Sequence, residues 1–168
     1  AKAWGATKVI LSDIDDNKIE FAKSLGHEYV INSLKENAVE EIMEITDGRG
    51  ADLCIEGAGA SVTFDQCMCA ARTFGRVVLM GNPIGDMTLT QKGYWEILRK
   101  QLTIKGTWNS SYIDMPKNDW KLALDAMAKG LIDVKPFITH RLSLEEYKPA
   151  FEMMRDRSAF FNKVMFTF

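Results

Sequence analysis

An acidic cluster follows the first apolar segment of the chain, and its side chains could do chemistry. The apolar run at residues 9–11 leads into Asp13, and Asp15, Asp16 and Lys18 follow closely. An ionised carboxylate only accepts hydrogen bonds, so Asp13 at a strand tip could hold two neighbouring hydroxyl groups of one sugar. Asp16, just ahead of a predicted helix, is better explained as a turn or helix-capping residue.

Short apolar segments alternate with amphipathic segments along most of the chain. The pattern predicts strands at residues 8–13, 28–32, 51–55, 75–80 and 102–106. It predicts helices at residues 16–25, 35–46, 61–72, 91–100 and 118–129, with Ser61 as the N-cap of the third. Alternation of this kind predicts an α/β fold with a doubly wound, mostly parallel sheet of the Rossmann type.

The C-terminal part of the chain is predicted to add a helix between two extended segments. Residues 136–142 and 163–168 are expected to be extended. Ser143 and Glu146 have the spacing of a capping box, which predicts a helix running toward residue 155. Pro149 would remove a backbone hydrogen bond inside that helix, so we expect its regular part to start at Pro149.

A doubly wound sheet binds ligands beyond the carboxyl ends of its strands. If residues 8–13 are the second strand, Asp13 stands where a dinucleotide-binding fold holds the adenosine ribose, and its charge would favour NAD over NADP. Residues 1–6 are then the end of the first helix, and the glycine-rich phosphate-binding turn would precede residue 1. Many methyltransferases also present a strand-tip acid to their cofactor, so Asp13 alone does not decide between these classes.

Composition narrows the possibilities further. The net charge of −2 gives no electrostatic footprint for nucleic acid or an anionic membrane. No apolar stretch approaches the roughly 20 residues that span a bilayer. Cys54, Cys67 and Cys69 form no CxxC pair, which favours small core residues in a reducing compartment such as the cytoplasm.

The domain prediction is a single dinucleotide-binding domain over residues 1–168 that is truncated at its N-terminus. Its core would occupy residues 1–140, and residues 141–168 would form a return helix and strand. The first strand and the glycine-rich turn are expected to lie in chain that precedes residue 1, because the sequence opens on AKAWGA without a start Met.

Three stretches closely resemble zinc-type medium-chain dehydrogenases of the sorbitol dehydrogenase kind. They are GATKVILSDIDDNKIEFAKSLGHEYVIN, GRGADLCIEGAGA and VKPFITHRLSLEEYKPAFEMM, and the similarity runs in register over nearly the whole chain. GRVVLMGNPIGDMTLT followed by WEILRKQLTIKGTWNSS is most similar to the galactitol-1-phosphate 5-dehydrogenase group. The resemblance implies a cofactor domain that works beside an N-terminal catalytic domain, toward which residues 141–168 would pack.

The resemblance places contacts to the cofactor on single charged residues and on three strand-end segments. Asp13 matches the ribose-binding acid, Lys18 matches a basic position beside that ribose, and Lys163 matches one near the pyrophosphate. The segments are Gly57, Ala58 and Gly59 on the adenine side, Met80, Gly81 and Asn82 at the nicotinamide carboxamide, and Thr107, Trp108 and Asn109 at the neighbouring strand end. The ordinary alternatives are a solvated helix face for Lys18, a plain turn for residues 57–59 and a surface position for Lys163.

No catalytic or metal-binding residue is expected in this chain. His27 and His140 have no ligand partner at useful spacing, and Cys67 and Cys69 would point to different faces of one helix. The resemblance implies that zinc is held by Cys, His and Glu residues of the N-terminal domain.

The implied function is that of an NAD-dependent, zinc-type oxidoreductase of polyol metabolism. It would transfer a hydride from a polyol or polyol phosphate, such as galactitol 1-phosphate, to NAD. The fragment alone would be inactive, and the family implies a homo-oligomer with a dimer contact near TIKGTW. Two alternatives stay open: a zinc-free NADPH quinone or enoyl reductase, which Asp13 disfavours, and a non-catalytic module that binds NAD and regulates a partner.

Overall fold

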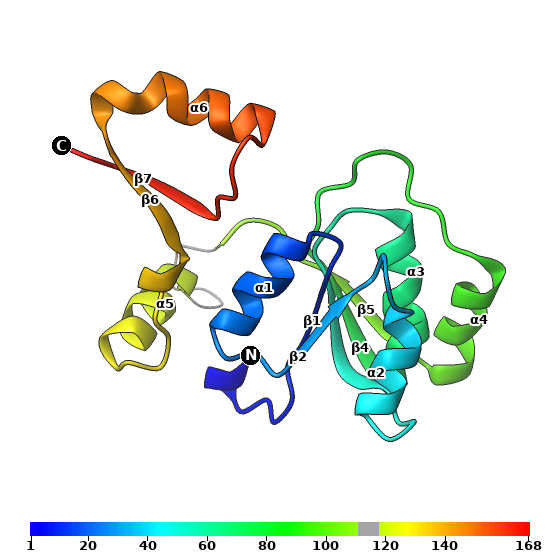
Figure 1. Ribbon diagram of the computed structural model, residues 1–168. Helices are drawn as coiled ribbons and strands as arrows, with labels where there is room; N and C mark the ends of the chain where they lie inside the picture. The colour runs from blue at the N-terminus through cyan, green and yellow to red at the C-terminus, as the bar shows by residue number, and fades with distance from the viewer. Residues whose placement is uncertain (111–117) are drawn as a thin grey trace. The chain divides into compact units, whose positions relative to one another are not determined.

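The computed structural model describes residues 1–110 and 118–168, and the chain forms two compact units (Figure 1). The larger unit is Lys8–Asn109, and the smaller unit joins Ala1–Thr7 to Ser110–Phe168. The boundary predicted at residue 140 lies inside the smaller unit, and that division stays a prediction.

The larger unit alternates strands and helices, as predicted. Its elements are β1 (Ile10–Asp13), α1 (Asp16–Ser24), β2 (Tyr29–Asn32), α2 (Ala38–Ile45), β3 (Ala51–Glu56), α3 (Ser61–Ala70), β4 (Ala71–Leu79), α4 (Gln91–Lys100) and β5 (Thr103–Gly106). β1 pairs with β2, and β3, β4 and β5 form a second sheet in that order; every pair is parallel. The α/β class with parallel sheets is therefore confirmed, while a strand and a glycine-rich turn before residue 1 stay predictions.

Two helix starts differ from the predictions. Asp15, not Asp16, is the N-cap of α1, and its carboxylate accepts the Asn17 N–H at 2.8 Å. Asp16 is the first residue of α1, where its carboxylate accepts from the side chains of Asn32 and Lys35.

Ser61 is also not an N-cap, because α3 starts at Ser61 and is preceded by Ala60. The Ser61 hydroxyl instead bonds the loop that leads to α4. It accepts the Thr88 N–H at 2.9 Å and donates to the Asp86 carbonyl at 3.2 Å. A hydroxyl engaged with a loop that is distant in sequence is not available to cap its own helix.

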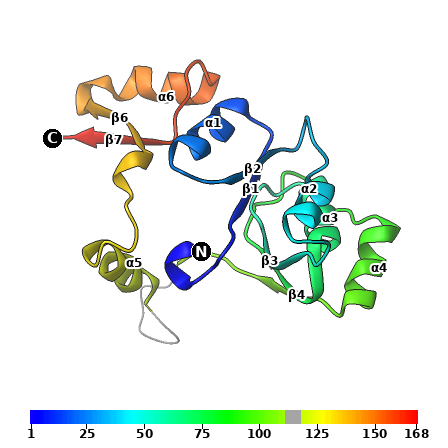
Figure 2. The ribbon, with the colours of Figure 1, turned by 60° about the horizontal axis from the view of Figure 1, so that its bottom comes forward.

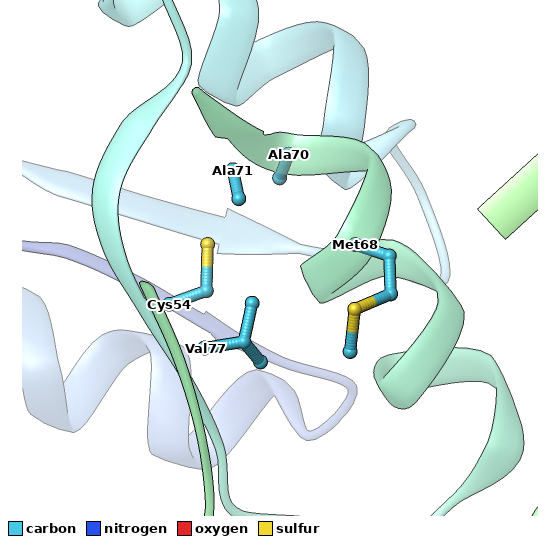
Figure 3. Packing of buried hydrophobic residues seen from close by; sticks show 5 residues of the cluster. All are labelled: Cys54, Met68, Ala70, Ala71 and Val77. Atoms are coloured by element: carbon cyan, nitrogen blue, oxygen red, sulfur yellow. The ribbon is translucent and has the colours of Figure 1, made fainter. Parts of the chain in front are cut away.

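The core of the larger unit lies between the β3–β4–β5 sheet and helices α2, α3 and α4. Figure 3 shows its buried centre, formed by Cys54, Met68, Ala70, Ala71 and Val77. Partly buried side chains from all three helices, among them Val39, Ile42, Phe64 and Ile97, pack against this cluster. Cys54 and Cys69 are buried, which confirms the predicted core role for these two cysteines.

The strand pleat decides which β3 side chains meet this core. Cys54 and Glu56 are buried, whereas Leu53 and Ile55 between them are 43% and 54% exposed. Side chains of a strand alternate between the two faces of the sheet, so Glu56 is turned to the same side as the helices.

The smaller unit carries one parallel strand pair. Its elements are the 3-10 turns Lys2–Trp4, Lys135–Phe137 and Leu144–Glu146, together with α5 (Asp119–Ala128), β6 (Ile138–Ser143), α6 (Tyr147–Asp156) and β7 (Lys163–Thr167). β6 pairs with β7, and α6 lies between them in the chain, as Figure 2 shows from a second angle.

The predicted capping box is present, but Pro149 does not start the helix. Glu146 accepts the Ser143 N–H at 2.8 Å and opens the 3-10 turn Leu144–Glu146. α6 then begins at Tyr147, so Pro149 lies in its first turn. The first N–H groups of a helix have no intrahelical partner, so proline loses nothing there.

Gly93 lets α4 approach α3 closely. A Cβ on Gly93 would collide with the Asp65 carboxylate of α3, which accepts the N–H and the hydroxyl of Thr90 at 2.9 and 2.6 Å. Leu89 Cδ1 would lie 2.8 Å from the same Cβ. The packing of these two helices therefore depends on a position without a side chain.

Gly93→Ala should lower the free energy of unfolding by about 1–3 kcal/mol, because overpacking outweighs the better helix propensity of alanine. Urea unfolding followed by circular dichroism measures the change. Gly85→Ala is the matched control, because a Cβ there meets nothing within 4 Å. Equal stability of the two variants would contradict this account of the helix contact.

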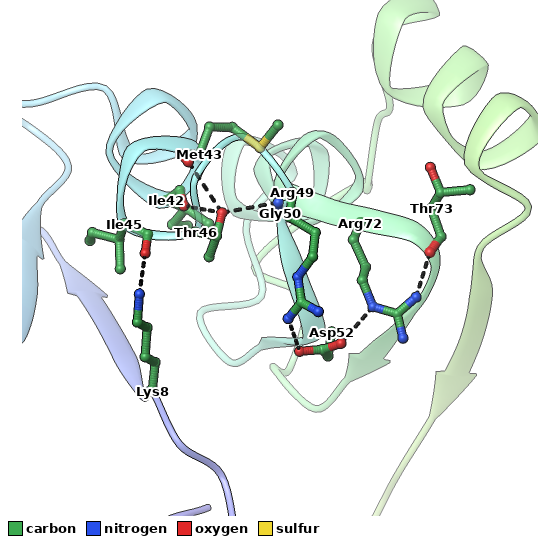
Figure 4. A network of polar contacts seen from close by, with 10 residues as sticks. All are labelled: Lys8, Ile42, Met43, Ile45, Thr46, Arg49, Gly50, Asp52, Arg72 and Thr73. Atoms are coloured by element: carbon green, nitrogen blue, oxygen red, sulfur yellow. Dashed lines mark hydrogen bonds and ion pairs between the residues drawn. The ribbon is translucent and has the colours of Figure 1, made fainter.

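A polar network fixes the amino ends of β3 and β4 (Figure 4). Asp52 forms ion pairs with Arg49 and Arg72, and the hydrogen bond from Arg72 is the main cause that lowers the pKa of Asp52 below its ordinary value of 3.8. Thr46 accepts the Gly50 N–H at 2.9 Å. These groups are largely exposed, so their effect on stability is expected to be small.

Asp52→Asn should destabilise the protein slightly at neutral pH, and this penalty should be smaller at about pH 3, below the ordinary pKa of the carboxyl group. A carboxylate whose pKa is lower in the folded state adds stability above its unfolded pKa, and this contribution disappears as pH falls through the folded pKa. Urea unfolding of both proteins at the two pH values tests the difference. A penalty that persists unchanged in acid would exclude the ion pairs as its cause.

Candidate functional site

The carboxyl ends of three parallel strands lie side by side in the larger unit. Glu56, Leu79 and Gly106 are register partners across β3, β4 and β5. The three predicted cofactor segments, residues 57–59, 80–82 and 107–109, each begin directly after one of these residues. The structure therefore brings together at one sheet edge three segments that are far apart in sequence.

Backbone hydrogen bonds hold these segments to one another. The Glu56 carbonyl accepts the N–H groups of Met80 and Gly81, each at 2.9 Å. The Leu79 carbonyl accepts the Thr107 N–H at 2.9 Å. Main-chain hydrogen bonds therefore join the three strand ends.

Two glycines make the closest approach possible. Gly59 has a φ of +70°, and a Cβ on it would overlap the Asn82 carbonyl. A Cβ on Gly81 would collide with the Gly59 nitrogen and would lie 2.9 Å from the Gly57 carbonyl carbon. Gly57 is different, because a Cβ there would meet only Met80 Cε at 3.4 Å. Glycine is therefore sterically required at positions 59 and 81. At position 57 the surrounding residues leave room for a Cβ.

Glu56 anchors the turn at residues 57–59 and was not singled out by sequence reasoning. Its side chain is 2% exposed. Oε1 accepts the N–H groups of Ala58 and Gly59 at 2.9 and 2.8 Å and the Thr63 hydroxyl at 2.7 Å. An acid at the end of an apolar strand and directly before a glycine turn is the signal that could have identified it.

Asp13 is the last residue of β1 and pairs in register with Asn32 of β2. Its Oδ1 accepts the N–H groups of Ile14 and Asp15 at 2.8 and 3.1 Å, which orients the carboxylate. Its Oδ2 lies 3.3 Å from Lys18 Nζ, and the two side chains are 35% and 57% exposed. The structure thus brings Asp13 and Lys18 together, with one carboxylate oxygen held by the backbone and the other near solvent.

The remaining predicted contact residues have distinct positions. Met80 and Trp108 are 56% and 77% exposed at the sheet edge of the larger unit. Lys163 begins β7 in the smaller unit, where it pairs with Ile138, and its role near a pyrophosphate stays a prediction.

The described residues offer no ligand set for a metal. Within 1–110 and 118–168, no group of three or more His, Cys, Asp or Glu side chains could hold an ion. The hydrogen bond with Cys54, reinforced by burial, raises the pKa of Cys67, so this thiol stays protonated.

Over residues 1–110 and 118–168, no helix has both the length and the apolarity needed to cross a membrane.

A solvent-open hollow lies at the other end of the strands. It has a volume of about 420 Å³ and is lined by Gly48, Arg49, Arg72 and Thr73, which flank the amino ends of β3 and β4. Parallel sheets bind ligands at the carboxyl ends, so this hollow is not the candidate site.

Comparisons with known proteins show the family of this chain. Residues 1–129 match the family described as zinc-binding dehydrogenase. L-threonine 3-dehydrogenase from Pyrococcus horikoshii is 36% identical over 156 residues, which are 92% of this chain and 43% of that protein. Less than half the length of this relative is therefore spanned by the chain.

Solved structures of dehydrogenases are similar to this chain in fold. Galactitol-1-phosphate dehydrogenase from Escherichia coli superposes with a TM-score of 0.83 at 30% identity, over 97% of this chain and 47% of that one. Alcohol dehydrogenase from Thermotoga maritima superposes with a TM-score of 0.76 at 30% identity, over 97% and 44%. The resemblance predicted from sequence is confirmed, and the chain belongs to the zinc-binding dehydrogenase family.

Proposed function

We propose that this chain is the cofactor-binding part of a zinc-dependent oxidoreductase that transfers a hydride from a polyol or polyol phosphate to NAD. The observation that supports it best is the sheet edge at residues 57–59, 80–82 and 107–109. Gly59 and Gly81 let two of these segments pack directly against each other, at the carboxyl ends of the strands where a doubly wound fold binds its ligand.

Asp13 would select the cofactor. Its Oδ2 is the oxygen not occupied by the backbone of residues 14 and 15, so it is the oxygen that could accept from ribose hydroxyls. Lys18 Nζ lies beside the same oxygen and would compete with the ribose hydroxyls for it or share it with them. A 2′-phosphate would meet the carboxylate charge, which favours NAD.

The residues of this chain would bind and orient the cofactor. The backbone after β4 and β5 would hold the nicotinamide carboxamide and fix which face of the ring meets the substrate. The zinc ion, which no described residue here can hold, would act as a Lewis acid on the substrate oxygen when bound by other parts of the protein. Reaction specificity would therefore depend on parts of the protein outside the described residues. The same proposal includes a homo-oligomer whose dimer contact lies near residues 103–108.

A second candidate substrate is L-threonine. The similarity to L-threonine 3-dehydrogenases over 92% of the chain favours it. The similarity in fold to galactitol-1-phosphate dehydrogenase favours the polyol phosphate. Both are secondary alcohols that would be oxidised to ketones with the same cofactor.

The direct test is an assay of the full-length protein with galactitol 1-phosphate, L-threonine and a free polyol, each with NAD⁺, following NADH absorbance. Turnover that chelators abolish and zinc restores would support the proposal. Binding of NAD⁺ without turnover of any alcohol would favour a regulatory module, and turnover of quinones or enoyl substrates with NADPH would favour the zinc-free reductases.

Asp13→Ser should weaken NAD⁺ binding about tenfold and remove discrimination against NADP⁺, because the ribose loses a charged acceptor and the 2′-phosphate loses a repelling one. Isothermal titration of the full-length protein with both cofactors measures the two dissociation constants. Asp16→Asn is the control, since Asp16 faces Asn32 and Lys35 and should leave both values unchanged. Unaltered cofactor preference in Asp13→Ser would remove this role for Asp13.

A further inference from the structure

Glu56 is a deeply buried acidic residue of the larger unit, and it is not one of the proposed cofactor contacts. It lies directly beneath two of the three predicted cofactor segments. Its Oε1 holds the turn at 57–59 through the Ala58 and Gly59 N–H groups. Its Oε2 stands 2.7 Å from the point where a Cβ on Gly81 would lie, and its own carbonyl accepts the Met80 and Gly81 N–H groups.

A buried carboxylate needs hydrogen-bond donors that replace the water it has lost. Its side chain is 2% exposed, and a carboxylate taken out of water is strongly destabilising unless it is hydrogen-bonded. Among residues 1–110 and 118–168, no lysine or arginine forms an ion pair with it. The donors are the N–H groups of Ala58 and Gly59 and the Thr63 hydroxyl, all at Glu56 Oε1. The single proton of that hydroxyl is shared with the Ala60 carbonyl, 2.9 Å away.

The Glu56 carboxylate lies where three parts of the larger unit meet. Glu56 ends β3, Thr63 belongs to the first turn of α3, and Gly81 follows β4. Movement of the turn at 57–59 away from residues 80–82 would leave a buried charge without donors, so the carboxylate opposes that movement. Gly59 and Gly81 remove the side chains that would keep the two segments apart.

We propose that Glu56 is a positioning residue of the cofactor site, whose carboxylate holds the 57–59 turn against residues 80–82 and thereby sets the affinity for the dinucleotide. This inference rests on the proposed function, because it assumes that these two segments contact the cofactor. Glu56 acts through the backbone that it orients, and no contact between its side chain and the cofactor is required.

Glu56→Gln should weaken binding of NAD⁺ and NADH by a similar factor, about tenfold, while kcat at saturating cofactor stays within about threefold. The amide keeps one acceptor oxygen but loses the charge that strengthens the bonds from Ala58, Gly59 and Thr63. Titration of the full-length protein with each cofactor, steady-state kinetics and thermal melting provide the three readouts.

Thr63 supplies an independent pair of variants should Glu56→Gln fail to fold. Thr63→Val removes the hydroxyl donor at nearly constant shape and should weaken both cofactors about threefold. Thr63→Ser keeps the hydroxyl and should restore wild-type affinity. Rescue by serine is a response that loss of packing alone would not give.

Asp65→Asn is the matched control for a stability effect. Asp65 also accepts a backbone N–H and a threonine hydroxyl on one oxygen, but it joins α3 to α4 through Thr90. The Asp65→Asn variant should have a lower melting temperature and unchanged affinities for NAD⁺ and NADH.

Three results would overturn the inference. Glu56→Gln could melt earlier yet bind both cofactors as the wild type does, which would make Glu56 purely structural. It could lose affinity for NAD⁺ alone, which would indicate a direct charge effect on the cationic ring. Thr63→Val and Thr63→Ser could bind equally well. Failure of the wild-type protein to bind either NAD⁺ or NADP⁺ would instead remove the proposed function itself.

Discussion

Close backbone contact between the turn after β3 and the segment after β4 is the constraint on which the candidate site depends. Neither segment could approach the other if residue 59 or residue 81 carried a Cβ. The contact is held by hydrogen bonds from Met80 and Gly81 to the Glu56 carbonyl, while the Glu56 carboxylate holds the turn from within. Backbone groups and exposed side chains such as Met80 and Trp108 share this surface, and we propose that a large cofactor common to many substrates binds there.

The parallel sheet explains why segments so distant in sequence meet. Strands that run in one direction present their carboxyl ends at one edge, and the helices between them return the chain to the opposite edge. Register pairing of Glu56, Leu79 and Gly106 aligns these ends within the β3–β4–β5 sheet. The amino ends carry a different chemistry, in which Arg49 and Arg72 share Asp52 at the surface.

Membership of the zinc-binding dehydrogenase family and the geometry of the edge are separate findings, since the family model is matched by sequence and the edge is described by the structure. The family relatives are more than twice as long as this chain, which spans 43% of the Pyrococcus horikoshii relative. The described residues offer no group of metal ligands, and the sheet edge is the surface that we propose for the cofactor. Division of labour between a cofactor-binding part and a substrate-binding part would let similar cofactor surfaces serve relatives named for threonine, galactitol 1-phosphate and other alcohols.

The sequence by itself determined the order and type of the elements, because periodicity and strand length are local properties. It also identified the family and predicted the strand ends at which ligands should bind. Only the tertiary structure showed that Asp15 caps α1, that Ser61 bonds a distant loop, and that Glu56 is buried beneath the cofactor segments. The contacts of Ser61 and the burial of Glu56 depend on which remote parts of the chain come together, and a linear pattern of residue types does not contain that information. The cap of α1 is a local choice among neighbouring acids of the same type, which residue type alone does not make.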